Sequence, residues 1–217
     1  MKKVILSLVV VSALVLTSCK KESNAGDAEE VATASDDATP YVLVADASTV
    51  EWVGSKPAGK HNGTIAVSNG EIYLNNGKIE SGKFTIDMSS ITVLDLAAGE
   101  GKEDLEAHLK GTAEGKEDHF FDVAKYPEAS FEITTVNTVD GQTTIEGNLT
   151  MKGITKNVKF PASILVDEDT LTITSDSFAI NRTDWGVNYA SKSIFDDLKD
   201  KFVDDNIELK VAVKASK

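Results

Sequence analysis

The chain has very little cysteine: Cys19 is the only one among 217 residues. A lone cysteine cannot form an internal disulfide, so the sequence excludes the disulfide frameworks on which many small exported domains rely. Histidine is nearly as rare, and the three histidines show neither the i, i+4 nor the His-x-His spacing that places metal ligands on one surface. We therefore expect no metal site.

Recognisable catalytic motifs are absent as well. The sequence contains neither a Gly-x-Ser-x-Gly nucleophile motif nor a glycine-rich phosphate loop. Its 35 acidic and 22 basic side chains give a formal net charge of −13, which disfavours nucleic acid as a partner. The sequence therefore favours a protein that is not an enzyme and has no cofactor. A hydrolase or isomerase that uses His61 or His108 with a carboxylate is the alternative.

Long hydrophobic runs are missing except near the N-terminus. Two lysines precede an apolar segment, residues 4–16, which is too short for a typical transmembrane helix but suits a signal peptide. The segment ends in Leu16-Thr17-Ser18-Cys19, which resembles a bacterial lipobox. We therefore expect a lipoprotein signal peptide at residues 1–18 and acylation of Cys19, for example with palmitate. Two or more acyl chains would anchor the protein stably to a membrane.

Residues 19–40 would then consist of the lipidated cysteine and a flexible acidic tether. This stretch is rich in Ala, Ser, Asp, Glu and Thr, so it cannot bury enough apolar surface to offset the entropy of ordering. Lys20 stands where an Asp retains lipoproteins in the inner membrane of enteric bacteria. The expected location is therefore the outer membrane of the cell envelope, on its periplasmic face or at the cell surface. Residues 41–217 are long enough for one domain with a hydrophobic core.

From residue 41 onward the dominant pattern is a strict alternation of apolar and polar side chains. In GKFTIDM, for example, Phe84, Ile86 and Met88 alternate with polar neighbours. Such alternation is typical of strands with one buried and one solvated face. At least eight such segments are separated by turn signals, among them Asn69-Gly70 and Asp140-Gly141. The pattern predicts an all-β fold, either an antiparallel sandwich or an up-and-down barrel.

One segment has a helical period instead. In residues 101–111, Leu105, His108 and Leu109 share one helical face, acidic residues occupy the first turn, and Gly111 suits the end of a helix. The spacing predicts one short helix here and a helical turn within residues 193–202.

Several positions expected to point inward are small or flexible. Gly82, Gly147 and Ala162 are small, whereas Met88 and Met151 adapt to irregular apolar shapes. An eight-stranded barrel can be filled by its own side chains or can hold one small ligand. The pattern favours a cavity, although a tightly curved, solid barrel would use the same glycines.

The segments LEAHLKG, HFFDVAKYPEASFEI, GNLTMKGITKNVKFP and INRTDWGVNY occur in this order, and together they resemble the YceI-like family over about residues 41–213. Members of that family form lipocalin-like antiparallel barrels that hold a long apolar lipid, of polyisoprenoid, isoprenoid-quinone or fatty-amide type, in a central tunnel. The resemblance implies an eight-stranded barrel with one short helix at residues 41–217, and an isoprenoid-like lipid as ligand. After Lys110 the insert GTAEGKEDH departs from the family pattern, and we expect it to alter the rim of the tunnel.

The resemblance also implies which side chains line the tunnel. The expected lining residues are Trp52, Phe84, Ile86, Met88, Leu105, His108, Phe120, Phe121, Phe131, Ile133, Leu149, Met151, Phe160, Phe178 and Arg182. Of Phe120 and Phe121, we expect one to close the apolar end of the barrel and the other to touch the ligand or the helix, unless both are plain core. His108 is either a satisfied, half-buried histidine or a contact for a ligand headgroup. Arg182 either forms a structural ion pair with Asp184 or meets a headgroup at the tunnel mouth.

The favoured function is therefore binding of a long-chain apolar lipid, which the protein would sequester or carry at the cell envelope. Its expected partners are this lipid and the membrane to which its N-terminus is anchored, and a homodimer is left open. A solid barrel that acts as a surface interaction protein is the main alternative. The inward Trp, Phe and Met side chains beside glycines favour lipid binding over that alternative.

Overall fold

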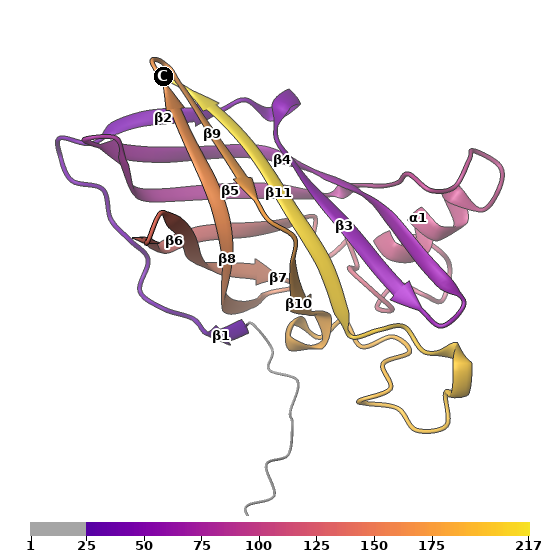
Figure 1. Cartoon of the computed structure of the whole chain (residues 1–217). Helices are drawn as coiled ribbons and strands as arrows, with labels where there is room; N and C mark the ends of the chain where they lie inside the picture. Colours follow the sequence, from indigo (N-terminus) through magenta and orange to yellow (C-terminus); the bar gives the residue numbers. More distant parts are fainter. Residues whose placement is uncertain (1–24) are drawn as a thin grey trace, which may run out of the picture.

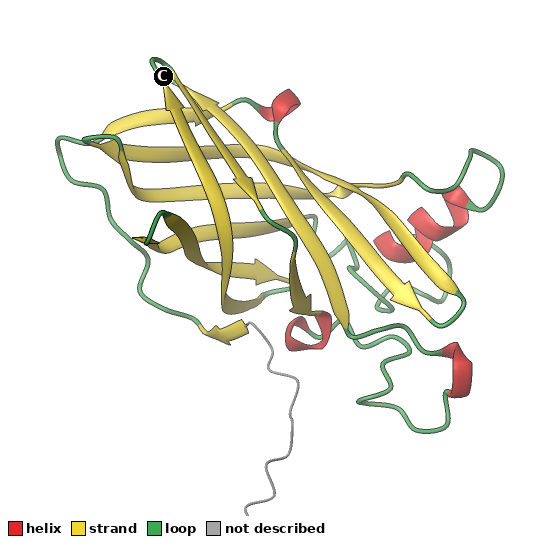
Figure 2. Ribbon diagram, in the orientation of Figure 1, coloured by secondary structure: helices red, strands yellow, loops and turns green. Residues whose placement is uncertain are grey.

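The strands of the computed structural model, which describes residues 25–217, form one antiparallel sheet that closes on itself (Figure 1). Figure 2 shows that strands make up most of the structure and that the helical segments lie between or beyond them. The strands are β1 (Ala25–Asp27), β2 (Thr39–Leu43), β3 (Thr49–Lys56), β4 (Gly59–Asn75), β5 (Lys78–Val93), β6 (Glu128–Val139), β7 (Gln142–Met151), β8 (Ile154–Asp167), β9 (Thr170–Ser175), β10 (Phe178–Asn181) and β11 (Asn206–Ser216).

Eight strand positions make up the barrel wall. Six of them are continuous strands, β4 to β8 and β11. A seventh is shared by β2 and β3, which both pair with β4 and β11 and are separated by the 3-10 turn η1 (Ala45–Ala47). The eighth is shared by β9 and β10, which pair with successive parts of β11. The predicted eight-stranded, lipocalin-like antiparallel barrel is therefore confirmed, with two of its positions interrupted.

The helical predictions are also confirmed in outline. Helix α1 (Lys102–Lys110) ends at Gly111, whose φ of 71° is the left-handed conformation that glycine adopts without strain. Within residues 193–202 the helical turn is the short 3-10 segment η3 (Lys199–Lys201). Another 3-10 segment, η2 (Arg182–Trp185), follows β10 directly.

The turn expected at Asn69-Gly70 is wrong. Strand β4 continues through these residues, and the pairing register with β5 shifts between Val67 and Asn69, which marks a β-bulge. A side chain at position 70 would lie 2.8 Å from the ring of Phe84, so the glycine lets this ring pack against the neighbouring strand. The Asn-Gly pair therefore serves close packing within a long strand, and the hairpin turn comes later, after Asn75.

The flexible tether predicted for residues 20–40 is wrong from Ala25 onward. Residues 25–38, here called the N-terminal strap, run along the outside of the barrel from β1 to β2 (Figure 1). Strand β1 pairs with β8, the backbone of Glu29 exchanges two hydrogen bonds with the side chain of Asn148, and the N–H of Ala32 donates to the carbonyl of Ile133. The strap therefore belongs to the barrel domain.

The strap is ordered by hydrogen bonds to strand edges, not by apolar burial. The ladder between β5 and β6 covers only Lys83–Asp87 of β5, so beyond it the carbonyl of Ile133 is free to accept from the strap. Sheet edges offer unpaired backbone groups to any extended segment. The tether prediction rested on the low apolar content of this stretch, so it missed hydrogen bonds that the backbone makes. The expected signal peptide, Cys19 and the first tether residues lie outside the described residues.

The interior of the barrel contains two hydrophobic clusters that meet in the middle. One surrounds Ile72 and Leu171, and the other surrounds Trp52, Ile91 and Trp185. Partly buried side chains pack against both clusters and so join them: Ile65, Ile86, Phe131, Phe178 and Leu209.

Candidate ligand-binding cavity

Two apolar cavities lie inside the barrel. The larger has a volume of about 230 Å³ and lies near α1, and the smaller has a volume of about 80 Å³. They share four wall residues, Val50, Ile86, Leu149 and Leu209, and therefore adjoin one another. The larger cavity is lined mainly by the cluster around Trp52, and the smaller mainly by the cluster around Ile72.

Each of the side chains predicted to line the tunnel lies on the wall of one of these cavities. The larger cavity is lined by Trp52, Ile86, Met88, Leu105, His108, Phe120, Phe121, Leu149, Met151 and Arg182. The smaller cavity is lined by Phe84, Ile86, Phe131, Ile133, Leu149, Phe160 and Phe178. Their contact with a ligand stays a prediction, which the geometry makes possible.

The sequence prediction missed other wall residues. Val50 lies two residues before Trp52 on β3, and Leu209 is the register partner of Trp52 on β11, so strand alternation could have found both. Val203 and Asp204 also line the larger cavity, but they belong to the connection before β11. No periodic signal marks such loop residues.

The smaller cavity is lined by a series of aromatic rings. Phe160 and Phe178 stack with centroids 4.5 Å apart, and Phe131 lies 5.7 Å from Phe160 and 6.4 Å from Phe84. A side chain at position 147 would lie 2.3 Å from the ring of Phe131, so Gly147 makes room for that ring. The small residue thus accommodates a wall side chain and does not itself open the cavity.

Phe120 and Phe121 both line the larger cavity, so the structure matches neither sequence alternative as stated. Their loop is fixed on both sides: the N–H of Phe121 donates to the carbonyl of Leu109 in α1, and Lys152 donates to the carbonyl of Phe120. Lys152 also pairs with the exposed Asp118 at 2.7 Å. The loop therefore holds two aromatic rings against the end of the cavity that α1 covers.

His108 lies in a cluster of rings at this end. Its Nε2 is 2.8 Å from Nδ1 of His119, its ring meets Phe120 edge-on, and His119 stacks on Tyr189 with centroids 4.2 Å apart. Burial, followed by the positive charge of Lys116 and the neighbouring His119, lowers the pKa of His108. His108 is therefore a hydrogen-bonded, half-buried histidine that also lines the cavity. The insert residue His119 thus contacts the cavity wall through His108.

His61 forms a second polar site on the larger cavity. Its Nδ1 lies 2.8 Å from the carboxylate of Asp95, whose other oxygen accepts from the N–H of Asn62. Burial opposes ionisation of Asp95, but these hydrogen bonds outweigh it and keep the pKa of Asp95 below its ordinary value. From the sequence, His61 is expected to hydrogen-bond backbone in a turn, with a catalytic role as the alternative. The structure instead pairs it with a carboxylate 34 positions away in the chain, which local sequence does not indicate.

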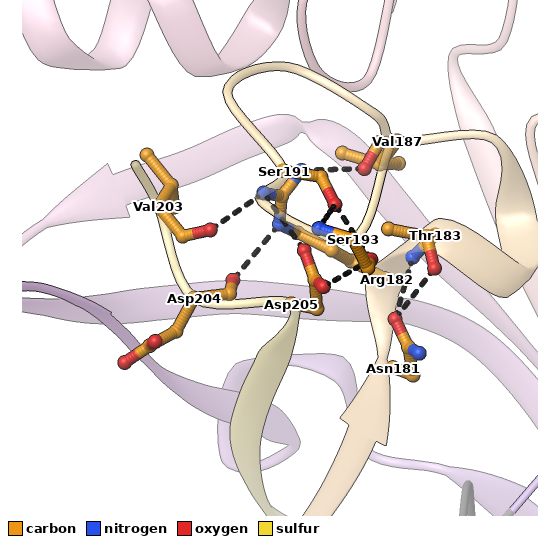
Figure 3. Close-up of polar contacts among 9 residues, drawn as sticks. All are labelled: Asn181, Arg182, Thr183, Val187, Ser191, Ser193, Val203, Asp204 and Asp205. Atoms are coloured by element: carbon orange, nitrogen blue, oxygen red, sulfur yellow. Dashed lines mark hydrogen bonds and ion pairs between the residues drawn. The ribbon is translucent and has the colours of Figure 1, made fainter. Parts of the chain in front are cut away.

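Arg182 is wholly engaged by the protein itself. Its guanidinium donates to the backbone carbonyls of Val187, Val203 and Asp204, and it lies 3.6 Å from the carboxylate of Asp205 (Figure 3). Burial lowers the pKa of Arg182, and the nearby carboxylates oppose this shift. Arg182 is therefore held within the protein, as the structural alternative expected, but the expected partner was Asp184 and the ion pair is with Asp205. The three carbonyls were not indicated by the sequence.

Between residues 25 and 217 no three His, Cys, Asp or Glu side chains are grouped so that they could hold a metal ion. The helices of that part of the chain are all too short or too polar to span a membrane.

The match to known proteins covers nearly the whole barrel domain. The model of the YceI-like domain family matches residues 41–215. A UPF0312 protein of Pseudomonas putida strain GB-1 is 31% identical over 103 residues, which are 47% of this chain and 48% of that protein. Other Pseudomonas putida strains contain UPF0312 proteins with 30% identity over the same length. The chain thus matches about half the length of these curated relatives.

Solved structures show the same fold. Burkholderia cenocepacia BcnA superposes with a TM-score of 0.58 at 22% identity, over 78% of this chain and 96% of BcnA. A polyisoprenoid-binding domain from Saccharophagus degradans, implicated in plant cell wall breakdown, superposes with a TM-score of 0.56 at 12% identity, over 81% of this chain and 97% of that domain. The family match across residues 41–215 shows that the chain belongs to the YceI-like family.

Proposed function

We propose that this protein binds a long-chain apolar lipid inside its barrel and sequesters or carries it at the cell envelope. The observation that carries the proposal is the pair of adjoining cavities, whose walls are almost wholly apolar and pass from α1 into the middle of the barrel. The likeness to a polyisoprenoid-binding domain supports an isoprenoid-like chain as the ligand.

The energetics of such binding need no chemical step. Each CH₂ group that moves from water into an apolar space contributes about 0.8 kcal/mol. A chain of a dozen such groups would therefore gain on the order of 10 kcal/mol before the cost of ordering it is subtracted. Two cavities in series suit an extended chain better than a compact ligand.

We further propose that Cys19 is acylated after cleavage of a signal peptide at residues 1–18, and that the protein is held at the outer membrane. Because the strap is ordered from Ala25, only residues 20–24 separate the anchor from the barrel. These residues can span at most about 20 Å, at roughly 3.5 Å per residue. The barrel would then stay close to the membrane from which it takes its lipid.

Native mass spectrometry of the protein purified from its own host tests the binding proposal. We expect a discrete added mass that disappears on denaturation and that fragments as a long-chain lipid. A bare polypeptide mass, with no uptake when isoprenoid quinones and fatty amides are supplied, would contradict the proposal and favour a solid barrel that acts in surface interactions. The same spectra test the anchor, because diacylation of Cys19 adds a covalent mass that survives denaturation.

A further inference from the structure

The connection between η2 and β11 carries two adjacent apolar side chains that face water. Ile194 and Phe195, here called the apolar pair, have exposed fractions of 48% and 47%. All eight phenylalanines lie in the described part of the chain, and Phe195 is the only exposed one. Tyr189, in the same connection, is exposed as well. Exposed apolar side chains that are scattered singly are ordinary, whereas several of them in one loop indicate contact with another apolar body.

The apolar pair is presented by a loop whose base is fixed. Arg182 donates to the carbonyls of Val187 and Val203, and it thereby ties together the two ends of residues 188–202, here called the docking loop (Figure 3). Within this loop the carbonyl of the buried Ser191 accepts from both N–H groups of the apolar pair. Figure 1 shows the loop, which includes η3, projecting away from the strands. The exposure of the apolar pair therefore follows from a hydrogen-bonded turn.

The docking loop adjoins the larger cavity. Val203 and Asp204, which follow the loop directly, both line this cavity. The ring of Tyr189, at the start of the loop, lies 4.9 Å from that of His108 and 5.3 Å from that of Phe120, and these two side chains line the cavity as well. Both limbs of the loop therefore contact the wall of the cavity in which we propose that the lipid binds.

The N-terminal strap relates the docking loop to the proposed membrane anchor. Strand β1 lines the same polar surface groove as Lys192 and Ser193 of the loop. Residues 20–24 separate β1 from Cys19, the proposed site of acylation, and they can span at most about 20 Å. A membrane that holds an acylated Cys19 therefore lies within reach of the docking loop.

The charges of the docking loop decide which membrane it suits. The loop carries three acidic and three basic side chains and so has no net charge: Asp196, Asp197 and Asp200 against Lys192, Lys199 and Lys201. The whole chain has a formal net charge of −13, so an anionic membrane would not attract it. The two aspartates that follow the apolar pair also oppose deep insertion. The loop therefore suits shallow contact with a zwitterionic bilayer, in which apolar burial supplies the attraction.

We propose that the docking loop inserts its apolar pair into the interface of a zwitterionic bilayer and so holds the adjoining end of the larger cavity against that bilayer. A lipid then passes between bilayer and cavity without crossing water. The loop sets the rate of this exchange and leaves the affinity for the lipid unchanged. The inference rests on the proposed anchor and lipid binding, and it adds a second membrane contact to them.

The first experiment measures insertion with the acylated, full-length protein in phosphatidylcholine vesicles whose acyl chains carry bromine, a quencher of tryptophan fluorescence. Phe195→Trp places a reporter in the apolar pair, and Leu165→Trp places one at an exposed apolar position on β8. The emission of the wild type, which contains Trp52 and Trp185, is subtracted. We expect bromine to quench the reporter at position 195 and to leave the one at position 165 unquenched.

These outcomes separate the docking loop from the anchor. A protein that sediments with the vesicles but keeps an unquenched reporter at position 195 would overturn the docking loop and leave the anchor intact. A wild-type protein that does not sediment with the vesicles would refute the anchor, and the inference would fall with it. Equal quenching of both reporters would show that the barrel lies on the membrane without a preferred face, which also overturns the inference.

The second experiment measures lipid exchange in the same protein, anchored in phosphatidylcholine vesicles without bromine. A short-tailed isoprenoid quinone is added and partitions into the bilayer, and quenching of Trp52 in the cavity wall follows its entry into the barrel. Replacement of both Ile194 and Phe195 by Ser should slow this entry about tenfold, since two half-exposed side chains together lose about as much burial as one whole side chain. The final extent of quenching should not change.

The matched control replaces Leu165 and Val166, an adjacent pair of exposed apolar residues near the end of β8, by Ser. This variant should exchange quinone at the wild-type rate. Equal rates in the two double variants would overturn the inference, and so would a lower final extent of quenching in the loop variant, which would make the apolar pair part of the lipid site. A wild-type protein that takes up no quinone would contradict the lipid-binding proposal, while bromine quenching still decides whether the loop inserts.

Discussion

Arg182 and His108 are both basic side chains on the wall of the larger cavity, yet they stand in opposite situations. Arg182 is 1% exposed and is held by three carbonyls and the carboxylate of Asp205. His108 has one side-chain hydrogen-bond partner, another histidine, and is only partly buried. The comparison teaches that position on a cavity wall does not make a polar group available to a ligand. Its partners within the protein decide that.

The largest expected effect comes from replacing Arg182, which has more partners within the protein than His108. Arg182→Met should destabilise the fold by about 3–5 kcal/mol, because it leaves three carbonyls and Asp205 buried without their partner. Urea denaturation measures the loss of unfolding free energy. Arg182→Lys should be less stable than the wild type but more stable than Arg182→Met, since one ammonium cannot reach all the acceptors. A stable Arg182→Met protein that no longer retains lipid would instead make Arg182 a headgroup ligand.

Asn148, which holds the N-terminal strap, is a second buried polar side chain whose partners lie within the protein. Its removal should have a smaller effect. Asn148→Ala removes both hydrogen bonds to the backbone of Glu29 and should cost about 1–3 kcal/mol. Hydrogen exchange of the Glu29 amide should accelerate at the same time. Ser35→Ala, at the exposed end of the strap, serves as the control and should change stability much less. Equal losses of stability in Asn148→Ala and Ser35→Ala would show that the strap detaches as one unit.

The smallest expected effect is a change in the pH dependence of stability, and it comes from His108, which has fewer partners than Arg182. The folded state holds the pKa of His108 below its ordinary value of 6.5, so the unfolded chain binds its proton more readily. Stability from this group is therefore present above about pH 6.5 and is lost as the pH falls towards the lower folded pKa. We expect the free energy of unfolding to fall less between pH 7 and 5 in His108→Gln than in the wild type. Parallel curves for the two proteins would contradict this linkage.

Much of the cavity wall could be predicted because strands have a period of two. Once Phe84, Ile86 and Met88 are assigned to one strand, their common face follows from the backbone alone. The same logic extends to Leu149 and Met151 on β7. By contrast, Asn69-Gly70 has the composition of a turn but lies in a bulge, because β5 continues alongside and pairs with both residues.

The periodic pattern left a sandwich and a barrel open, and the resemblance to the YceI-like family selected the barrel. The sequence by itself determined the half-buried strands, the short helix that ends at Gly111, and the apolar side chains that face inward. These properties depend on local periodicity and on the conformational freedom of single residues. Only the tertiary structure decided the polar contacts: His61 with Asp95, Arg182 with Asp205, and the strap with β8. Each of them joins residues far apart in the chain, and it exists only once the register of the closed sheet has brought their elements together.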